Sequence, residues 1–289
     1  MAASDAPSHR RSAATSGSTI GCSEGMAHLA PGPRATGSVR PVGIDEMAAV
    51  GFGSSAATYE QGRPSYPPGV IDLFVTHLCV GPGARVVDLA AGTGKLTRLL
   101  VPTGATVVAV EPIEAMREQL RLHVPEVEVL DGTAEAIPLP DGSAHAVTVA
   151  QAFHWFDPQP ALTEIARVLE PGGGLGLVWN ERAESVPWVA ALSDLMNWGV
   201  QRPYQRHLDW VGLVAESGRF TPLQHRQLSY QQELDADTLV DRALSTSYIA
   251  ARPATENVEL TASIRALVAD FPARFELPYV TDVYWCHRA

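Results

Sequence analysis

Short apolar runs alternate with amphipathic segments along the chain from Val86 onward. Such alternation is typical of a parallel β-sheet whose strands are joined by helices. The apolar runs predict five strands, at Arg85–Leu89, Thr106–Glu111, Glu126–Leu130, Ala146–Ala150 and Gly174–Trp179. The segments between them predict three helices, at Gly94–Val101, Pro112–His123 and Pro160–Glu170. We therefore expect a doubly wound α/β core over about residues 86–180.

Proline and glycine mark the helix ends in this core. Pro112 suits the first position of a helix, after which Ile113, Met116 and Leu120 fall on one face. The run Pro171-Gly172-Gly173 predicts where the third helix ends.

The pattern changes after Trp179. Residues Pro187–Gly199 predict an apolar helix, which we expect to cover part of a ligand pocket. We assign residues 181–225 to this cover segment. Further along, the sequence predicts strands at Leu228–Glu233 and Tyr279–Trp285 and helices at Ala236–Leu244 and Val258–Phe271.

The first 46 residues are rich in small and polar residues and poor in large apolar ones. Such a segment cannot bury enough surface to offset the entropy lost on ordering. We therefore expect a disordered tail over residues 1–46 and a folded domain over residues 47–289.

Composition narrows the possible partners. A hydrophobic fraction of 46% and a charged fraction of 18% are ordinary for a globular protein, and no apolar run approaches the roughly 20 residues that span a bilayer. The net charge of −11 argues against nucleic acid as a partner. Cys22, Cys79 and Cys286 match neither a zinc spacing nor a disulfide framework, which fits a reducing, cytoplasmic compartment. We expect no membrane partner and no metal.

A glycine-rich turn, Asp88-Leu89-Ala90-Ala91-Gly92-Thr93-Gly94, follows the first predicted strand. Glycine lets a ligand approach the backbone closely, and a helix that begins there presents unpaired N–H groups. A phosphate-binding P-loop is excluded, because Leu89 stands where its first glycine is needed and Leu96 follows Lys95. A dinucleotide-binding turn needs a small residue where this chain has Thr97. This is a weak mismatch, so a dinucleotide-binding turn remains an alternative.

Asp88 at the strand end, followed by Ala90, Gly92 and Gly94, resembles the corresponding turn of class I S-adenosylmethionine-dependent methyltransferases. The resemblance implies that S-adenosylmethionine is the cofactor and that Asp88 supports the turn and the methionine end of the cofactor. Ala90 replaces the first glycine of the family, and we expect this to be tolerated if its backbone angle is ordinary. The family fold implies a mostly parallel, seven-stranded, Rossmann-like sheet with an antiparallel last strand and a helical cover.

The second predicted strand ends at Glu111-Pro112, where the family resemblance places the cofactor ribose. A carboxylate at Glu111 can accept both ribose hydroxyl protons, although NAD enzymes use an acid in the same way. The segment Gly132–Ser143 resembles the adenine-binding loop of the ubiquinone- and menaquinone-type branch, and NAD enzymes do not ordinarily carry such a loop. We assign Thr133 and Ala134 to the adenine, although Thr133 stands where that branch commonly has aspartate and Asp131 is an alternative.

The resemblance continues through Gln151–Asp157 and Glu164–Gly173. Ligands of open α/β sheets bind at the carboxyl ends of the strands. Four residues are therefore placed to line a pocket: Gln151, Phe153, His154 and Trp155. Upstream, Tyr59 and Arg63 belong to a segment that folds over the cofactor in a subset of the family.

Methylation of a small molecule is the function that these features favour. His154 is the candidate base if the acceptor is a hydroxyl or an amine. A carboxylate acceptor needs no base, and Arg63 or an arginine from residues 182–206 would orient it. An NAD-dependent oxidoreductase and a non-catalytic binding module remain alternatives. Five aromatic residues are candidates for either a pocket wall or the core: Phe153, Trp155, Trp179, Trp188 and Trp198.

Overall fold

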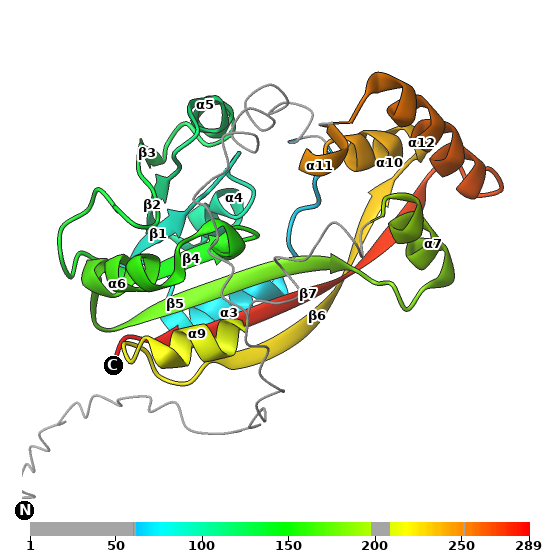
Figure 1. Cartoon of the computed structure of the whole chain (residues 1–289). Coiled ribbons are helices and arrows are strands. Elements are labelled where there is room, and N and C mark those ends of the chain that lie inside the picture. The colour runs from blue at the N-terminus through cyan, green and yellow to red at the C-terminus, as the bar shows by residue number, and fades with distance from the viewer. Residues whose placement is uncertain (1–59, 61, 198–208, 251) are drawn as a thin grey trace, which may run out of the picture. The chain divides into compact units, whose positions relative to one another are not determined.

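A seven-stranded sheet with helices on both faces is the central feature of the computed structural model (Figure 1). The structure describes residues 60, 62–197, 209–250 and 252–289, all of which belong to one compact unit. The tail expected over residues 1–46, together with Tyr59 and Trp198, lies outside the described residues. The strand order is β3-β2-β1-β4-β5-β7-β6.

Five strands form the parallel part of the sheet, with β1 (Arg85–Leu89) near its centre. It pairs in parallel with β2 (Thr106–Val110) on one side and β4 (Ala144–Ala150) on the other. β3 (Glu128–Leu130) and β5 (Leu169–Arg182) extend the parallel pairing. The predicted parallel α/β core is confirmed, and the carboxyl ends of its strands meet at one edge of the sheet.

The last strand of the chain runs against the others. β7 (Phe275–His287) pairs antiparallel with β5, and β6 (Gln224–Leu234) pairs antiparallel with β7 along its whole length. The expected antiparallel last strand is confirmed. β5, β6 and β7 are also the longest strands, and Figure 1 shows them continuing past the rest of the sheet.

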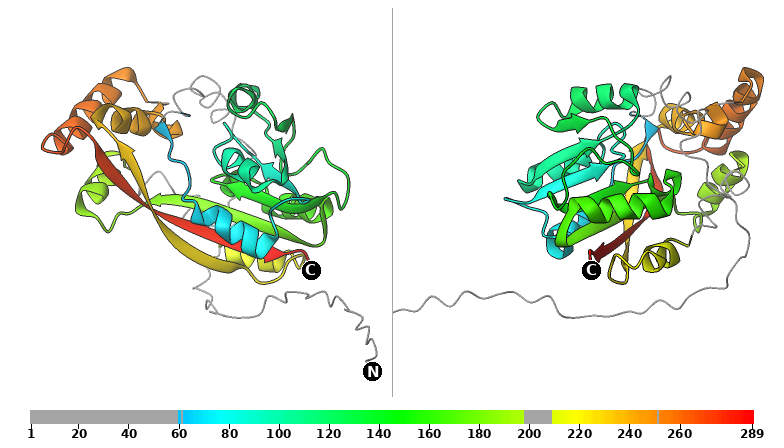
Figure 2. Two further views of the ribbon diagram at one scale, coloured as in Figure 1. Left: turned by 180° about the vertical axis from the view of Figure 1, so that it is seen from behind. Right: turned by 60° about the vertical axis from the view of Figure 1, so that its left-hand side comes forward.

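Helices cover both faces of the sheet (Figure 2), and an apolar layer lies on each face. One face packs against α3 (Gly69–Leu78) and α4 (Thr97–Leu100), which continues into the short 3-10 helix η1 (Val101–Thr103). The opposite face packs against α6 (Pro158–Val168), next to which lies α9 (Trp210–Glu216). Because strand side chains alternate between faces, Val87 and Leu89 join the second layer while Asp88 points toward α4.

A third apolar cluster lies at the far end of the long strands. There α7 (Pro187–Leu195), α10 (Ala236–Leu244) and α12 (Ala254–Leu267) pack with Leu277 and Tyr279 of β7, and α11 (Ser247–Ala250) follows α10. Trp188 lies edge-on to Phe271 and Phe275, with ring centroids 5.3 and 5.9 Å apart, so this tryptophan belongs to the core. That α7 covers a ligand pocket stays a prediction, since its buried face is directed into this cluster.

Several predicted helix boundaries are wrong. The helix predicted over Val258–Phe271 spans Ala254–Leu267, and the helix predicted over Pro187–Gly199 ends at Leu195. The helix predicted over Pro160–Glu170 ends at Val168, and the Pro171-Gly172-Gly173 run belongs to β5. Leu169 pairs with Ala144, and a Cβ on Gly173 would come within 3.0 Å of the His145 carbonyl oxygen, so the glycine permits close strand pairing.

Two further helices begin later than predicted. α4 begins at Thr97 instead of Gly94, and α5 (Glu114–His123) begins two residues after Pro112. In the turn the Gly94 N–H donates to the Ala91 carbonyl at 3.0 Å, a bond local to the turn that precedes the helix. Helix α3 was not predicted, although its buried Val70, Phe74 and Leu78 recur every four residues.

None of the helices in the described ranges is both long and apolar enough to cross a membrane.

Candidate functional site

The turn after β1 has left-handed backbone angles at three alternate positions. The φ angles are 55° at Ala90, 58° at Gly92 and 84° at Gly94. A Cβ on Gly94 would lie 3.0 Å from Cγ of Leu120 on α5, whereas a Cβ on Gly92 would meet nothing within 4 Å. Gly94 therefore packs the turn against a helix, and Gly92 leaves open space beside the backbone.

Ala90 does not have the ordinary backbone angle that we expected of it. A φ of 55° places it in the left-handed region, where the Cβ of an L-residue crowds the following carbonyl oxygen. This conformation costs an alanine about 1 kcal/mol relative to glycine. Such strain persists only where surrounding contacts impose it, and it is common at functional sites.

Replacing Ala90 by glycine is therefore expected to change the free energy of unfolding little, by about 0.5 kcal/mol or less in either direction. Relief of the left-handed strain offsets the greater entropy that glycine has in the unfolded chain. The matched control is Ala115→Gly in α5, which should lose about 1 kcal/mol. Urea denaturation measures both, and equal losses in the two variants would contradict the strain at Ala90.

Asp88 is a buried acid at the end of β1, with 1% of its surface exposed. Thr97 of α4 donates its hydroxyl to Asp88 Oδ2 at 2.6 Å, and Thr148 of β4 donates to Oδ1 at 3.3 Å. Burial raises the pKa of Asp88 to about 7, with a further contribution from the nearby charge of Glu111, and the two threonine hydroxyls oppose the shift. The carboxylate is thus held rigidly beneath the turn and gains stability from a cation nearby.

Glu111 holds the turn from the neighbouring strand. Its Oε2 accepts the Gly92 N–H and its Oε1 accepts the Ile113 N–H, each at 2.9 Å. Burial raises its pKa, while these two N–H groups and the nearby Arg117 oppose the shift. Each oxygen keeps capacity for a further donor such as a ribose hydroxyl.

Two N–H groups of the turn, which we expected to be unpaired, have partners within the protein. The Gly92 N–H donates to a carboxylate and the Gly94 N–H to a carbonyl. A dinucleotide site uses such N–H groups to bind pyrophosphate at the start of a helix. With two acids beside it, this turn suits a cationic group better than a phosphate.

Arg117 of α5 links the ends of β2 and β3. Its Nη1 donates to the Glu111 carbonyl at 2.7 Å and to Asp131 Oδ1 at 2.8 Å, and its Nη2 pairs with Glu114. The side chain is buried, so these are charge-assisted contacts partly shielded from water. Asp131, which we considered for adenine binding, is therefore engaged by this arginine.

The loop after β3 is compact. A Cβ on Gly132 would come within 2.5 Å of Pro138 Cδ, so glycine is required for the loop to fold back on itself. Ala134 is buried and Thr133 is exposed, and Thr133 forms an isolated β-bridge with Ala136. The two residues assigned to adenine thus differ in exposure.

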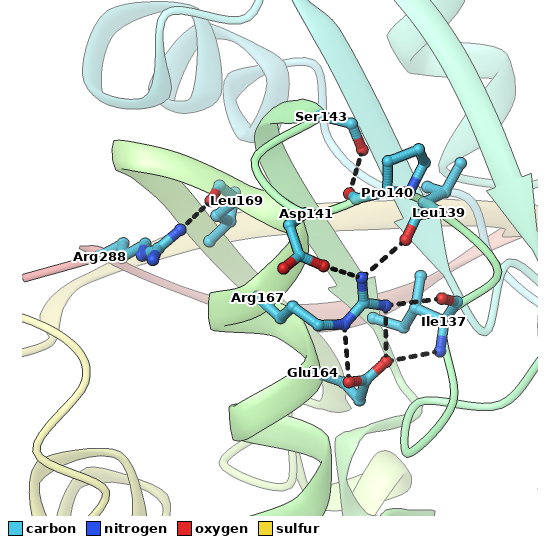
Figure 3. A network of polar contacts seen from close by, with 9 residues as sticks. All are labelled: Ile137, Leu139, Pro140, Asp141, Ser143, Glu164, Arg167, Leu169 and Arg288. Carbon is cyan, nitrogen blue, oxygen red and sulfur yellow. Dashed lines mark hydrogen bonds and ion pairs between the residues drawn. The ribbon is translucent and has the colours of Figure 1, made fainter.

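Arg167 of α6 fixes the second half of this loop (Figure 3). Its guanidinium pairs with both oxygens of Glu164 at 2.8 Å, which raises the pKa of Arg167. The same group donates to the Ile137 and Leu139 carbonyls at 2.9 and 2.8 Å and to Asp141 Oδ1 at 2.7 Å. Glu164 Oε2 also accepts the Ile137 N–H at 3.1 Å. One side chain therefore anchors three loop residues to the helix.

Glu60, just before the predicted Arg63, contacts the glycine turn. It accepts the Thr93 hydroxyl, and its Oε1 lies 2.6 Å from Arg98 Nη2 and 3.3 Å from Lys95 Nζ. Burial raises the pKa of Glu60, but the hydrogen bonds from Thr93 and Arg98 outweigh it and the net shift is downward. Arg63 lies close enough for its charge to lower the pKa of Lys95 further, after the larger effect of burial. The segment leading into the domain is thus bound to the turn.

The end of β4 carries a second strained residue. Gln151 has a φ of 58°, donates its N–H to the Val178 carbonyl at 2.9 Å, and donates its amide to the Asn180 carbonyl at 3.0 Å. His154 follows in the 3-10 helix η2 (Phe153–Trp155), with its ring 4.8 Å from that of Trp155. Phe153 is completely buried in the core, which is one of the two places that the sequence left open for it.

The structure brings several predicted residues together. Asp88, Gly92 and Glu111 form one connected group, since Glu111 binds the turn and its charge acts on Asp88. Sequence reasoning missed Glu60 and Arg117, which contact this group, and it missed Glu164 and Arg167, which hold the loop after β3. The pairing of Glu164 with Arg167 was detectable, because an acid and a base three positions apart on a helix face the same side.

Comparison with known proteins places this fold in a family. A family model described as a methyltransferase domain matches residues 87–177. An uncharacterised methyltransferase of Mycobacterium tuberculosis is 45% identical over 235 residues, which cover 80% of this chain and 92% of that protein. An uncharacterised methyltransferase-like protein of Schizosaccharomyces pombe is 33% identical over 223 residues, covering 76% of this chain and 87% of that protein.

Among solved structures, phosphoethanolamine N-methyltransferase 2 of Haemonchus contortus is similar in fold, with a TM-score of 0.53 at 13% identity. The match covers 86% of this chain and 60% of that chain, whose structure contains phosphomonomethylethanolamine and S-adenosylhomocysteine. At this identity the likeness shows the fold alone. Membership of the ubiquinone- and menaquinone-type branch stays a prediction. The identity of 45% to the mycobacterial protein shows common descent with it. The chain belongs to the class I S-adenosylmethionine-dependent methyltransferase family.

Proposed function

We propose that this protein transfers the methyl group of S-adenosylmethionine to a small-molecule acceptor. The observation that carries the proposal is the acidic glycine turn. Glu111 accepts a hydrogen bond from the Gly92 N–H, and Asp88 lies buried beneath the turn. A cofactor with a cationic amine and a sulfonium fits such a turn. The S-adenosylhomocysteine in the Haemonchus contortus structure supports the same cofactor class.

We assign each part of the cofactor to the residues that lie near its expected position. Asp88 supports the turn and the methionine end, the Glu111 carboxylate accepts the ribose hydroxyls, and Gly92 allows close approach of the backbone. Thr133 and Ala134 lie in the loop assigned to adenine, which Arg167 holds in position. The remaining residues assigned to cofactor binding stay predictions from the sequence: Ala90, Gly94, Pro112, Gln151, Tyr59 and Arg63.

The cofactor supplies a methyl group on an already activated leaving group. The protein therefore has to align the acceptor with that methyl group and exclude competing nucleophiles. His154 lies just after the carboxyl end of β4 and is our candidate base for a hydroxyl or amine acceptor. The net charge of −11 favours a small molecule over nucleic acid or an anionic membrane surface.

Replacing Gly92 by alanine tests the cofactor site. The added methyl group meets no protein atom within 4 Å, so the unfolding free energy should fall only by the left-handed strain of about 1 kcal/mol. The methyl group instead occupies the open side of the turn, and calorimetry should show S-adenosylmethionine affinity reduced by at least about ten-fold.

The matched variant is Gly94→Ala, whose methyl group would crowd Leu120 and should lower stability more than Gly92→Ala. Failure of the wild-type protein to bind S-adenosylmethionine would overturn the proposed cofactor. Tighter binding of NAD in the same titration would support an oxidoreductase instead. A screen of cell extract with methyl-labelled cofactor separates an enzyme, which forms labelled product, from a module that only binds.

A further inference from the structure

Arg242 is a buried cation on α10 whose donors are incompletely satisfied. Its side chain is 5% exposed, and its Nε and Nη1 atoms have no hydrogen-bond partner in the structure. Arg117 has nearly the same exposure, 6%, but pairs with Asp131 and Glu114. For Arg242, no carboxylate among the described residues forms such a pair.

An unpaired guanidinium is unfavourable in a protein interior. Buried charges are ordinarily paired, because moving an uncompensated charge out of water costs several kcal/mol. This cost is on the order of the stability of a whole domain. An anion that binds at Arg242 would recover much of this energy as charge-assisted hydrogen bonds.

Thr246 offers a second unsatisfied group at the same place. Its hydroxyl oxygen is buried and has no hydrogen-bond partner in the structure, and the residue is 3% exposed. It follows Arg242 by four positions and lies in the turn just after α10, where its N–H donates to the Ala243 carbonyl at 3.1 Å. A hydroxyl can donate to an anion that a neighbouring guanidinium binds.

The segment leading into the domain connects Arg242 to the candidate cofactor site. A Cβ on Gly62 would come within 3.1 Å of Arg242 Cα, so the segment leading into the domain packs directly on α10. Gly62 is two residues from Glu60, which binds Thr93 and Lys95 of the glycine turn. Two residues of chain span at most about 7 Å between Cα atoms, so α10 and the turn approach the same short segment.

We propose that Arg242 and Thr246 bind a carboxylate group of the methyl acceptor. The proposal rests on the proposed function, because the anion is assigned to the acceptor. An acidic protein with a net charge of −11 repels anionic small molecules in general, so a local cation is needed to retain one. Arg242 provides this charge, and Arg63 next to Gly62 adds to it.

The test replaces Arg242 by methionine, which approximates the unbranched apolar stem of arginine and removes the guanidinium charge. In chloride buffer Arg242→Met should be at least as stable to urea as the wild type, because a buried unpaired charge is replaced by an apolar group. A loss of stability would show that the arginine has a structural partner within the chain and would overturn the proposal.

The second measurement uses anions as probes, with the full chain saturated with S-adenosylhomocysteine. Succinate and benzoate at constant ionic strength should raise the melting temperature of the wild type, with affinity weakened at least about ten-fold in Arg242→Met and less in Thr246→Val. Inorganic phosphate is the comparison. Stabilisation by phosphate alone, or equal responses of wild type and Arg242→Met, would overturn the carboxylate assignment.

Two controls separate this result from the proposed function. Arg265→Gln on α12 removes an exposed arginine that pairs with Asp237, and it should keep the full response to carboxylates. Calorimetry with S-adenosylhomocysteine should give the same affinity for wild type and Arg242→Met. Absence of S-adenosylhomocysteine binding by the wild type would contradict the cofactor assignment, whereas loss of the carboxylate response alone contradicts the anion site.

Discussion

Asp88→Asn is expected to make the cofactor-free protein more stable at pH 8 and to weaken binding of S-adenosylmethionine. Burial raises the pKa of Asp88 to about 7 from its ordinary value of 3.8. The folded state therefore binds a proton more tightly than the unfolded state, and wild-type stability falls as the pH rises from about 4 to about 7. The full shift of the Asp88 pKa corresponds to a loss of about 4 kcal/mol in the free energy of unfolding at high pH. The asparagine variant does not have this loss.

Urea denaturation between pH 4 and pH 8 measures this difference. The Thr97 and Thr148 hydroxyls can rotate to bond the asparagine amide, so its shape is accommodated. The pKa of Glu111 is also raised and contributes in the same direction. Glu111 is present in both proteins, so only the part that arises from its repulsion with Asp88 differs between them. Asp72→Asn, at an exposed position, should leave the pH dependence unchanged.

In the same variant, S-adenosylmethionine affinity should fall by about ten-fold or more, since a cationic ligand loses a nearby carboxylate. Calorimetry at pH 8 is the appropriate measurement, because wild-type Asp88 is then mostly ionised. A variant that is both less stable at pH 8 and unchanged in affinity would contradict the role of Asp88.

Arg167→Met is expected to lower the free energy of unfolding by about 3 kcal/mol and to release the adenine-assigned loop. The substitution leaves the Glu164 carboxylate and the Ile137 and Leu139 carbonyls without the guanidinium that now binds them. Hydrogen exchange at the Ile137 amide, which donates to Glu164, reports the release directly.

Arg167→Lys separates charge from geometry at this position. One ammonium group cannot reach the carboxylate and both carbonyls together, so lysine should recover only a minor part of the loss. Arg121→Met, at an exposed arginine that pairs with Glu114, should leave loop exchange and stability nearly unchanged. Unchanged Ile137 exchange in Arg167→Met would contradict the anchoring role.

The sequence was sufficient for the parts of the fold that depend on local pattern. Buried parallel strands give apolar runs, and the boundaries of β1 and α10 agree with those predicted. The end of the third helix was not predictable in the same way. Proline and glycine usually end a helix, but here strand pairing of Leu169 and the close approach of Gly173 to β4 extend β5 backwards through that run.

The residues of the candidate site also differ in whether a local sequence pattern predicts them. Asp88, Gly92 and Glu111 follow a recognisable spacing, and the structure brings them together. Glu60, Arg242 and the left-handed angle of Ala90 depend on contacts between distant segments, and single residues in a sequence carry no signal of such contacts.

The long strands β5, β6 and β7 have a consequence for how this protein diverges from its relatives. The methyltransferase family model ends at residue 177, before the far halves of these strands and the helices α7, α10 and α12 that they carry. Substitutions in those helices alter packing around a third apolar cluster, while the turn and Asp88 are held by contacts with α4, β4 and α5. The helices α7, α10 and α12 can therefore change during evolution while the glycine turn and its acids stay the same.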